Sequence, residues 1–198
     1  MTDLWELENE CYDSGVTLLC GVDEAGRGPL AGPVYAAAVI LPRNRVIEGL
    51  NDSKKLSEKQ RERLFDEIRS AALGYGIARA EVEEIETLNI LNATFLAMNR
   101  AIAGLEPQPE LALIDGNQNR EIEFPSRTVI HGDALCASIA AASILAKVSR
   151  DHLMLELAEQ YPEYGFEQHK GYGTKAHYEA LRRFGPSPVH RLSFLKNL

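Results

Sequence analysis

The chain of 198 residues is 45% hydrophobic and 25% charged and carries a formal net charge of -8. This length supports one substantial core, so we expect a single domain over residues 1–198, and the composition excludes long disordered or collagen-like tracts. The most apolar stretches, near 34–41 and 134–148, are too short or too rich in Ala and Ser to cross a bilayer, and the acidic N-terminus lacks the basic start of a signal peptide. We therefore expect a cytoplasmic protein that does not enter a membrane.

Charge distribution and cysteine content bear on partners and cofactors. The net negative charge argues against nucleic acid, because phosphate binding depends on Lys and Arg. Basic residues nevertheless gather in 53–63, 169–177 and 190–196, although mixed helix surfaces would explain these clusters equally well. Three cysteines without a CxxC pair indicate neither a disulfide framework nor a thiolate zinc site, and we expect them to pack in the interior.

Two strands are predicted first along the chain. Residues 17–23 and 34–41 are apolar and partly β-branched, and Gly and Pro turn signals separate them. They can pair as an antiparallel hairpin with a long loop, GRGPLAGP. This loop follows two adjacent carboxylates, Asp23 and Glu24, after a single alanine.

A helix, a strand and a second helix are predicted next. Ser57 and Gln60 form a capping box, and the apolar face of the helix that follows consists of Leu64, Phe65, Ile68 and Ala72. Residues 74–82 favour a strand. Residues 92–103 favour a helix that Gly104 ends.

Strand and helix alternate in the second half of the chain. Short strands over 111–115 and 127–133 each end in an aspartate next to a glycine, and the small-residue helix ALCASIAAASILAKVSRDHLMLEL follows. A loop over 161–173 precedes a last helix, 175–184, which Thr174 caps. This order predicts the α/β class, with a mixed central β-sheet flanked by α-helices and a C-terminal helical region.

Four carboxylates share one expected location. Asp23, Glu24, Asp115 and Asp133 lie at or near the ends of predicted strands, where an isolated Asp is usually a turn or cap residue. Because three strand ends carry such acids, we expect the acids to converge on one crevice; ligand sites in open α/β sheets gather at the carboxyl ends of strands. Converging carboxylates repel one another, and Mg²⁺ or Mn²⁺ would offset that repulsion. Asp23 and Glu24 can share this site only if their strand twists or ends there.

A glycine pair, Gly26 and Gly28, flanks Arg27 directly after these acids. Glycines carry no Cβ and let a ligand approach the backbone closely. A plain tight turn is the simpler explanation of such a pair taken alone.

Five groups of residues then become informative as a set. They are GVDEAGRGPLAGPV, NDSKKLS, LIDGN, HGD followed by AASILAKVSRD, and HKGYGT ending with HRLSF. In order and spacing, over roughly residues 18–195, they resemble the type 2 ribonuclease H family of bacteria.

The resemblance implies an RNase H-like fold and an endonuclease that hydrolyses the RNA strand of RNA-DNA hybrids. It also implies nicking of duplex DNA 5′ to embedded ribonucleotides, with 3′-hydroxyl and 5′-phosphate products, in ribonucleotide excision, DNA repair and replication. The four acids would bind Mg²⁺ or Mn²⁺, with two ions during catalysis. Gly26, Arg27 and Gly28 would sense the 2′-hydroxyl beside the scissile phosphate, and Tyr172 would pack on the sugar of the following deoxynucleotide.

Three lysines are candidates for contacts with the substrate backbone. The resemblance assigns Lys54 and Lys55 to a phosphate-contacting segment, and a solvated approach to a helix is the alternative. Lys147 lies on the small-residue helix, where its stem could instead pack while its amine reaches solvent. Asp151 could extend the acidic site, but a structural role, capping or pairing with Arg150, is the favoured interpretation.

Other features refine the resemblance. His131 stands where relatives often carry Lys, so a positive charge near Asp133 would depend on pH. His169 and His177 have no convincing ligand set for zinc. The chain ends soon after HRLSF and lacks the large N-terminal substrate-binding domain of type 3 enzymes, which with Arg27 favours type 2. We see no apolar seam and expect a monomer.

Two alternatives stay open from the sequence. A phosphatase or phosphotransferase with an aspartate nucleophile would need a covalent intermediate, and the adjacent Asp-Glu pair fits metal ligation better. A non-catalytic RNA-DNA hybrid-binding module would use the acids to hold a structural metal ion. Replacing Asp23 by Asn distinguishes the binding-module hypothesis from the enzyme hypothesis, because in an enzyme this change removes cleavage and largely leaves duplex binding.

Overall fold

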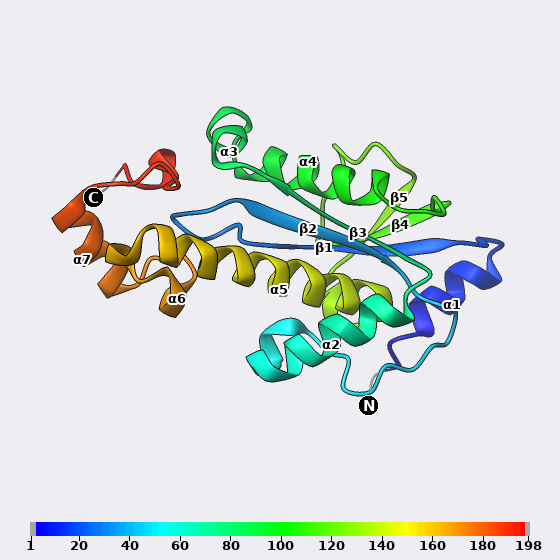
Figure 1. The fold of residues 1–198 in the computed structure, drawn as a ribbon. Coiled ribbons are helices and arrows are strands. Elements are labelled where there is room, and N and C mark those ends of the chain that lie inside the picture. The colour runs from blue at the N-terminus through cyan, green and yellow to red at the C-terminus, as the bar shows by residue number, and fades with distance from the viewer. Residues whose placement is uncertain (1–2, 197–198) are drawn as a thin grey trace.

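The computed structural model describes residues 3–196, which form a five-stranded mixed sheet between layers of helices (Figure 1). The strands are β1 (Leu19–Ala25), β2 (Val34–Ile40), β3 (Gly74–Ala80), β4 (Leu111–Asp115) and β5 (Ser126–Val129), in the spatial order β3-β2-β1-β4-β5. β2 runs antiparallel to β1 and β3, whereas β1, β4 and β5 are parallel. The predicted α/β class, mixed sheet and β1–β2 hairpin are confirmed.

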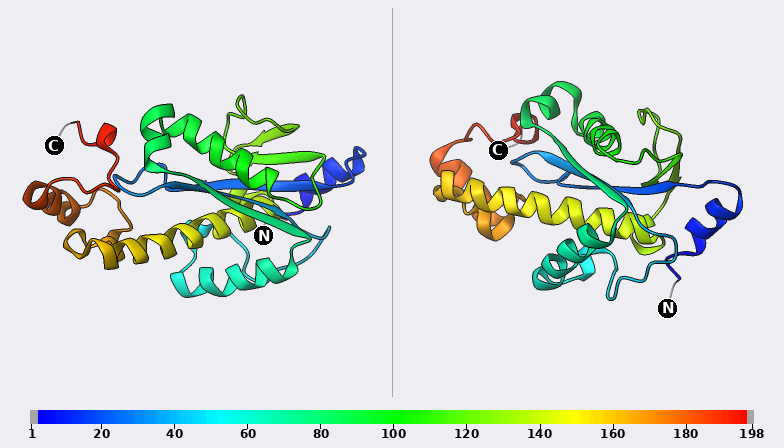
Figure 2. Two further views of the ribbon diagram at one scale, coloured as in Figure 1. Left: turned by 45° about the horizontal axis from the view of Figure 1, so that its top comes forward. Right: turned by 45° about the vertical axis from the view of Figure 1, so that its right-hand side comes forward.

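Helices cover both faces of this sheet. The main ones are α1 (Glu6–Asp13), α2 (Glu58–Ala71), α3 (Val82–Leu88), α4 (Ile90–Ala103), α5 (Ala137–Gln160), α6 (Phe166–His169) and α7 (Lys175–Phe184). In both views of Figure 2, α4 and α5 stay on opposite sides of the sheet and α2 lies outside α5. The short α6 lies against the C-terminal part of α5, and α7 lies beyond the end of α5; together they form the predicted C-terminal helical region (Figure 1).

Small residues let the helices approach the sheet closely. Every residue of β2, VYAAAVI, is buried, with alternate side chains facing the α4 layer and the α5 layer. Gly21 of β1 faces α5, and a Cβ at this position would collide with the backbone of Ser138 and Ile139. The alanine-rich start of α5 therefore packs directly on β1, which fixes this helix relative to the carboxyl end of the strand.

The predicted boundaries hold where local signals are strong. Ser57 and Gln60 form the expected capping box of α2, and Thr174 caps α7 through the backbone N–H of His177. The three cysteines are free and buried, as expected. Within residues 3–196, every helix falls short of the combined length and apolarity needed to span a bilayer.

Other boundaries were wrong for identifiable reasons. β1 continues beyond residue 23 because Ala25 still pairs with Tyr35 of β2. The strand predicted over 127–133 stops at Val129, since His131 adopts a left-handed φ of 58° and Gly132–Ala134 forms a 3-10 turn. Three helices, α1, α3 and the short α6, were not predicted, because they are too short or too polar to show a clear apolar period.

Candidate active site

The carboxyl ends of β1 and β4 bring three predicted acids to one cavity. Val22 pairs with Ile114, so Asp23 and Asp115 lie one residue further along on neighbouring parallel strands. Asp23 faces the α5 side of the sheet, and Glu24 faces the opposite side. All three line a cavity of about 210 Å³ at the end of the strands, which we call the acidic cavity. The strand ends two residues after Asp23, and the adjacent carboxylates share this cavity at the rim of the sheet.

The fourth acid, Asp133, reaches the site from the 3-10 turn before α5. The carboxylate Oδ1 of Asp115 accepts a hydrogen bond of 2.7 Å from the backbone N–H of Gly132, which holds this turn against β4. Asp133 Oδ2 lies 3.5 Å from Lys54 Nζ, and Lys54 lines the acidic cavity. Asp133 is not itself part of the lining; its role as a metal ligand stays a prediction.

Mutual repulsion and burial dominate the electrostatics of these acids. Burial raises the pKa of Asp23 well above its ordinary value, and the negative charges of Glu24 and Asp115 raise it further. Burial also raises the pKa of Glu24, although Arg27 opposes the effect. The pKa of Asp133 is raised by burial and then by the charge of Asp115. The cavity therefore has a deficit of positive charge.

A divalent cation fits this deficit, but the side chains do not form a ready-made cage. Within residues 3–196, no three His, Cys, Asp or Glu side chains come close enough together to hold an ion by themselves. Asp23 Oδ1 accepts a hydrogen bond of 2.7 Å from the Glu24 backbone N–H, so one lone pair of this carboxylate is not available to a cation. Mg²⁺ is usually held by one or two carboxylates plus water and substrate phosphate, and the donors present suit that kind of site.

A buried arginine that was not predicted as a site residue holds the Gly-Arg-Gly loop in shape. Arg191, which is fully buried, donates to the carbonyl oxygens of Gly26 at 2.7 Å, Arg27 at 3.1 Å, Pro29 at 2.9 Å and Gly32 at 2.8 Å. In a trans peptide the C=O and the next N–H point in opposite directions. The N–H groups of Arg27 and Gly28 therefore point away from Arg191, and they donate to no acceptor in residues 3–196.

A second buried arginine, Arg150 of α5, supports the same loop. Its guanidinium donates to the carbonyls of Ala31 at 3.0 Å, Pro33 at 3.1 Å and Lys170 at 3.0 Å. Gly26 has φ 98°, and a Cβ there would collide with this guanidinium, so position 26 requires glycine. Arg150 makes no ion pair with Asp151, which corrects the predicted pairing.

Arg27 and Tyr172 border the acidic cavity from the loop and from the segment before α7. Arg27 Nη1 lies 3.5 Å from Glu24 Oε1, and half of the Arg27 side chain is exposed. Tyr172 is 46% exposed, and a Cβ on Gly28 would sit 3.7 Å from its ring, within ordinary contact distance. The structure thus brings Gly26, Arg27, Gly28 and Tyr172 together beside the acids, as predicted.

The structure separates the predicted lysines. Lys54 lines the acidic cavity, where Asp133 and Asp23 outweigh the effect of burial and raise its pKa. Lys55 is turned away and pairs with Asp52 at 3.7 Å. Lys147 also lines the cavity, but its Nζ donates to Asp151 Oδ1 at 2.7 Å. Asp151 is thus a structural partner of Lys147, in agreement with the structural interpretation.

Two further cavity residues were missed. Ser53 and Ser143 hydrogen-bond each other through their hydroxyl groups at 2.7 Å and line the cavity together with Lys54 and Lys147. Serines are common in helices and turns, so the sequence alone gave no signal for this pair. Their bond fixes the turn that carries Lys54 to α5.

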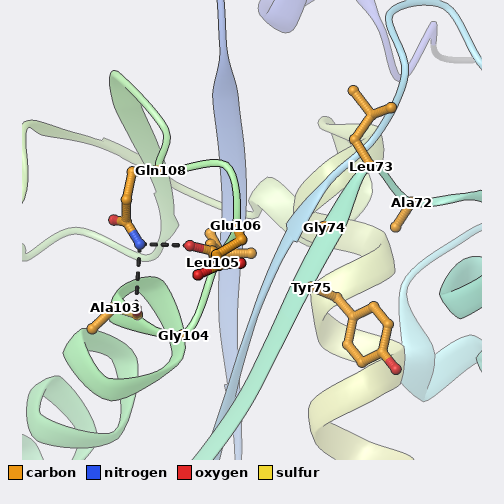
Figure 3. Close-up of a pocket in the computed structure, with 9 residues that line it drawn as sticks. All are labelled: Ala72, Leu73, Gly74, Tyr75, Ala103, Gly104, Leu105, Glu106 and Gln108. Carbon is orange, nitrogen blue, oxygen red and sulfur yellow. Dashed lines mark hydrogen bonds between the residues drawn. The ribbon is translucent and has the colours of Figure 1, made fainter.

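A larger hollow elsewhere on the molecule lacks the chemistry of the acidic cavity. It has a volume of about 480 Å³ and lies where β3 begins and α4 ends (Figure 3). Gln108 donates there to the carbonyls of Ala103 and Leu105, at 3.2 and 2.6 Å (Figure 3). Gly74 pairs with Ile40, at the end of the sheet remote from the acids. This hollow is therefore a separate surface feature.

Comparisons with known proteins identify the family of this chain. A family model described as Ribonuclease HII matches residues 20–197. The chain belongs to the ribonuclease HII family. The Ribonuclease HII of Caldicellulosiruptor bescii is 52% identical over 194 residues, which cover 98% of this chain and 94% of that protein. The Ribonuclease HII of Burkholderia thailandensis is 59% identical over 183 residues, covering 92% and 86%.

A solved structure supports the same conclusion. The crystal structure of the ribonuclease H2 from Pyrococcus horikoshii OT3 matches with a TM-score of 0.73 and 25% identity, covering 91% of this chain and all of that one. The expected RNase H-like fold is confirmed. The enzyme is a type 2 ribonuclease H, an endonuclease for the RNA strand of RNA-DNA hybrids, and the phosphatase and binding-module alternatives are not favoured.

Proposed function

We propose that this enzyme nicks duplex DNA on the 5′ side of an embedded ribonucleotide, leaving a 3′-hydroxyl and a 5′-phosphate. The observation that carries the proposal is the position of the Gly-Arg-Gly loop and Tyr172, which share one cavity with the carboxylates. A nuclease that recognises only a phosphodiester does not need groups that bind a ribose beside its acids.

Each side chain has a distinct task in this proposal. Asp23, Glu24, Asp115 and Asp133 hold Mg²⁺ or Mn²⁺, which, when bound, supplies an activated water and stabilises the leaving oxygen. The free N–H groups of Arg27 and Gly28 donate to the ribose 2′-hydroxyl or its phosphate, since this hydroxyl is what distinguishes RNA from DNA at one nucleotide.

The remaining groups orient the strand. The Tyr172 ring, exposed beside Gly28, packs on the deoxyribose that follows the ribonucleotide. Lys54 and Lys147 also line the cavity and contact backbone phosphates. Lys55 points elsewhere and has at most a weak part in binding.

The proposed activity also implies a cellular process, a compartment and an oligomeric state. Ribonucleotide excision in DNA repair and replication would take place in the cytoplasm of a bacterial cell. The enzyme would act as a monomer, because every side chain with a proposed task in the reaction comes from this one chain.

A cleavage assay tests the proposal. We expect a labelled duplex with one ribonucleotide to give a single nick at its 5′ side in Mg²⁺ or Mn²⁺. The matched all-DNA duplex should remain intact, and chelation of the metal should stop the reaction. No nick at the ribonucleotide, or equal cutting of the all-DNA duplex, would contradict the proposal.

A further inference from the structure

Two buried histidines meet behind Tyr172, outside the acidic cavity. His177 of α7 is fully buried, and His190, in the segment after α7, is 2% exposed. Their Nε2 atoms lie 3.0 Å apart. Neither ring contacts the carboxylates, so the proposed function does not account for this pair.

The hydrogen bonds of the pair define which ring nitrogen carries each proton. The backbone N–H of Ser187 donates to His190 Nδ1 at 2.9 Å, so the proton of neutral His190 is on Nε2. The carbonyl of Tyr172 can only accept, so His177 Nδ1, 2.9 Å away, donates to it. His177 Nε2 is then free to accept from His190 Nε2, and the two assignments agree.

The chain of bonds connects the two parts of the site that face the substrate. At one end it holds the carbonyl of Tyr172. At the other end, His190 immediately precedes Arg191, whose guanidinium holds the carbonyls of Gly26 and Arg27. The backbone of Arg191 also donates to Leu30 in the same loop at 2.8 Å. We call Arg150, Arg191, His177 and His190 the arginine–histidine network.

A metal site is a poor explanation for these rings. His169 stacks on His177 with ring centroids 4.4 Å apart. Its Nε2 donates to the Tyr164 carbonyl at 2.9 Å, and its Nδ1 accepts from Gly171 at 3.2 Å. All six ring nitrogens of the three histidines therefore have protein partners, and none is available as a ligand.

We propose that His177 and His190 are positioning residues that set the Tyr172 backbone relative to the Gly-Arg-Gly loop and thereby determine the preference for an RNA-to-DNA step. The inference rests on the proposed roles of Tyr172 and the loop. A ring packed on one sugar and N–H groups bound to the neighbouring ribose must keep a fixed separation, and the His177–His190 bond ties the two elements together.

The experiment compares two substrates. One is a duplex with a single ribonucleotide, whose 3′ neighbour is a deoxynucleotide, and the other is a hybrid with a continuous RNA strand. The ratio of their kcat/KM values measures junction preference. We expect His177→Leu to lower this ratio about tenfold, while kcat/KM on the continuous hybrid changes less than about threefold. His152→Leu alters an exposed histidine of α5 that is bonded to Glu62 of α2, and it should leave the ratio unchanged.

A double-mutant cycle identifies the route of the effect. Tyr172→Ala should also lower the ratio, and adding His177→Leu to it should cause little further loss, because both changes remove the same interaction. Additive losses, or an equal loss on both substrates, would overturn the positioning role. If Tyr172→Ala alone leaves the ratio unchanged, the proposed role of Tyr172 fails, and the inference fails with it. If Tyr172→Ala lowers the ratio and His177→Leu does not, the inference about the histidines is overturned and the proposed role of Tyr172 stands.

Conservative variants keep the test decisive if His177→Leu does not fold. The amide of Asn can take the place of Nδ1, and the longer Gln places its amide near Nε2. We expect both variants to lose most of the junction preference, because Asn keeps only the bond to the Tyr172 carbonyl and Gln keeps only the bond to His190. A wild-type ratio in either variant would overturn the proposal.

Discussion

The acidic cavity and the arginine–histidine network bury charged or titratable groups in opposite ways. In the cavity, like charges face one another, and burial raises the pKa of Asp23 well above its ordinary value. In the network, Arg191 and Arg150 are surrounded by backbone carbonyls that accept their N–H groups. The carboxylates of the cavity can still bind a cation and a substrate, whereas the guanidinium groups of the network already donate to the carbonyls of the loop.

The difference shows what each kind of burial is suited for. A buried cation whose donors are all satisfied makes the surrounding backbone rigid, and removing it leaves several acceptors unpaired. A buried carboxylate group without a full set of partners is destabilising in isolation and is stabilised by a ligand. Mutations in the cavity should therefore harm activity without harming stability, and mutations in the network should harm both.

Asp23→Asn should produce the largest loss of activity. Asn keeps the acceptor for the Glu24 N–H but removes a charge needed for the cation, so cleavage should fall by about a thousandfold or more. The metal-free melting temperature should rise by about a few degrees, because like-charge repulsion is relieved. Calorimetry and the nicking assay measure the two effects. A lower melting temperature, or cleavage at the wild-type rate, would contradict the contrast between the regions.

Arg191→Met should lower both stability and activity. It leaves the carbonyls of Gly26, Arg27, Pro29 and Gly32 without their donor, at a cost of about 3 to 5 kcal/mol in the free energy of unfolding. A shift of the loop by about 1 Å can reduce cleavage about a hundredfold. Urea unfolding and assays well below the melting temperature separate these losses.

An exposed arginine provides the control for Arg191. Arg183→Met, on α7, should change stability and cleavage little. If Arg191→Met has the stability of this control, the network is not the support of the loop.

Lys54 and Lys55 offer a sharper test because they are adjacent. Lys54→Met removes the lysine that lines the cavity and should lower kcat/KM about tenfold, most strongly at low salt. Lys55→Met removes an exposed partner of Asp52 and should change it less than about twofold. If the two changes lower kcat/KM equally, the positions of these lysines in the free protein do not determine which of them contacts the substrate.

The smallest expected effect concerns the pH dependence of stability. Burial, with the nearby His177, lowers the pKa of His190 to about 4, whereas an unfolded His titrates near 6.5. The unfolded chain therefore takes up the proton first, and the contribution of neutral His190 is full above pH 6.5 and declines as the pH falls toward 4. The stability advantage of wild type over His190→Gln should shrink by about 1 to 2 kcal/mol between pH 7 and 4.5. Urea unfolding at several pH values measures it, and a constant difference would contradict it.

Strand ends could be predicted from the sequence because their signals are local. Asp23 and Asp115 follow apolar runs, and the parallel pairing of β1 with β4 brings them together as expected. Asp133 was placed on a strand, but Ile130 is exposed and His131 turns the chain, and neither feature is visible in an apolar pattern.

The supports of the site could not be predicted in the same way. Arg191 bonds to carbonyls more than 150 residues away in the sequence, and any residue supplies a carbonyl, so no side-chain pattern marks the partner. Lys54 and Lys55 are neighbours of the same type, and the 3-10 turn Ser53–Lys55, capped by Asp52, directs them to different partners, Asp133 and Asp52. The acids were therefore visible as residue types at predicted strand ends, whereas the buried side chains that hold the loop around them were not.

Contact between a cation in the acidic cavity and the scissile phosphate is the central claim, and a sulfur substitution tests it directly. The single-ribonucleotide duplex would carry a phosphorothioate of defined configuration at the bond 5′ to the ribonucleotide, with each of the two isomers assayed in Mg²⁺ and in Mn²⁺. Mg²⁺ binds sulfur poorly and Mn²⁺ binds it better. We predict that at least one isomer is cleaved about tenfold or more slowly than the phosphate in Mg²⁺ and is largely restored in Mn²⁺. Equal rates in the two ions for both isomers, relative to the phosphate substrate, would contradict the claim.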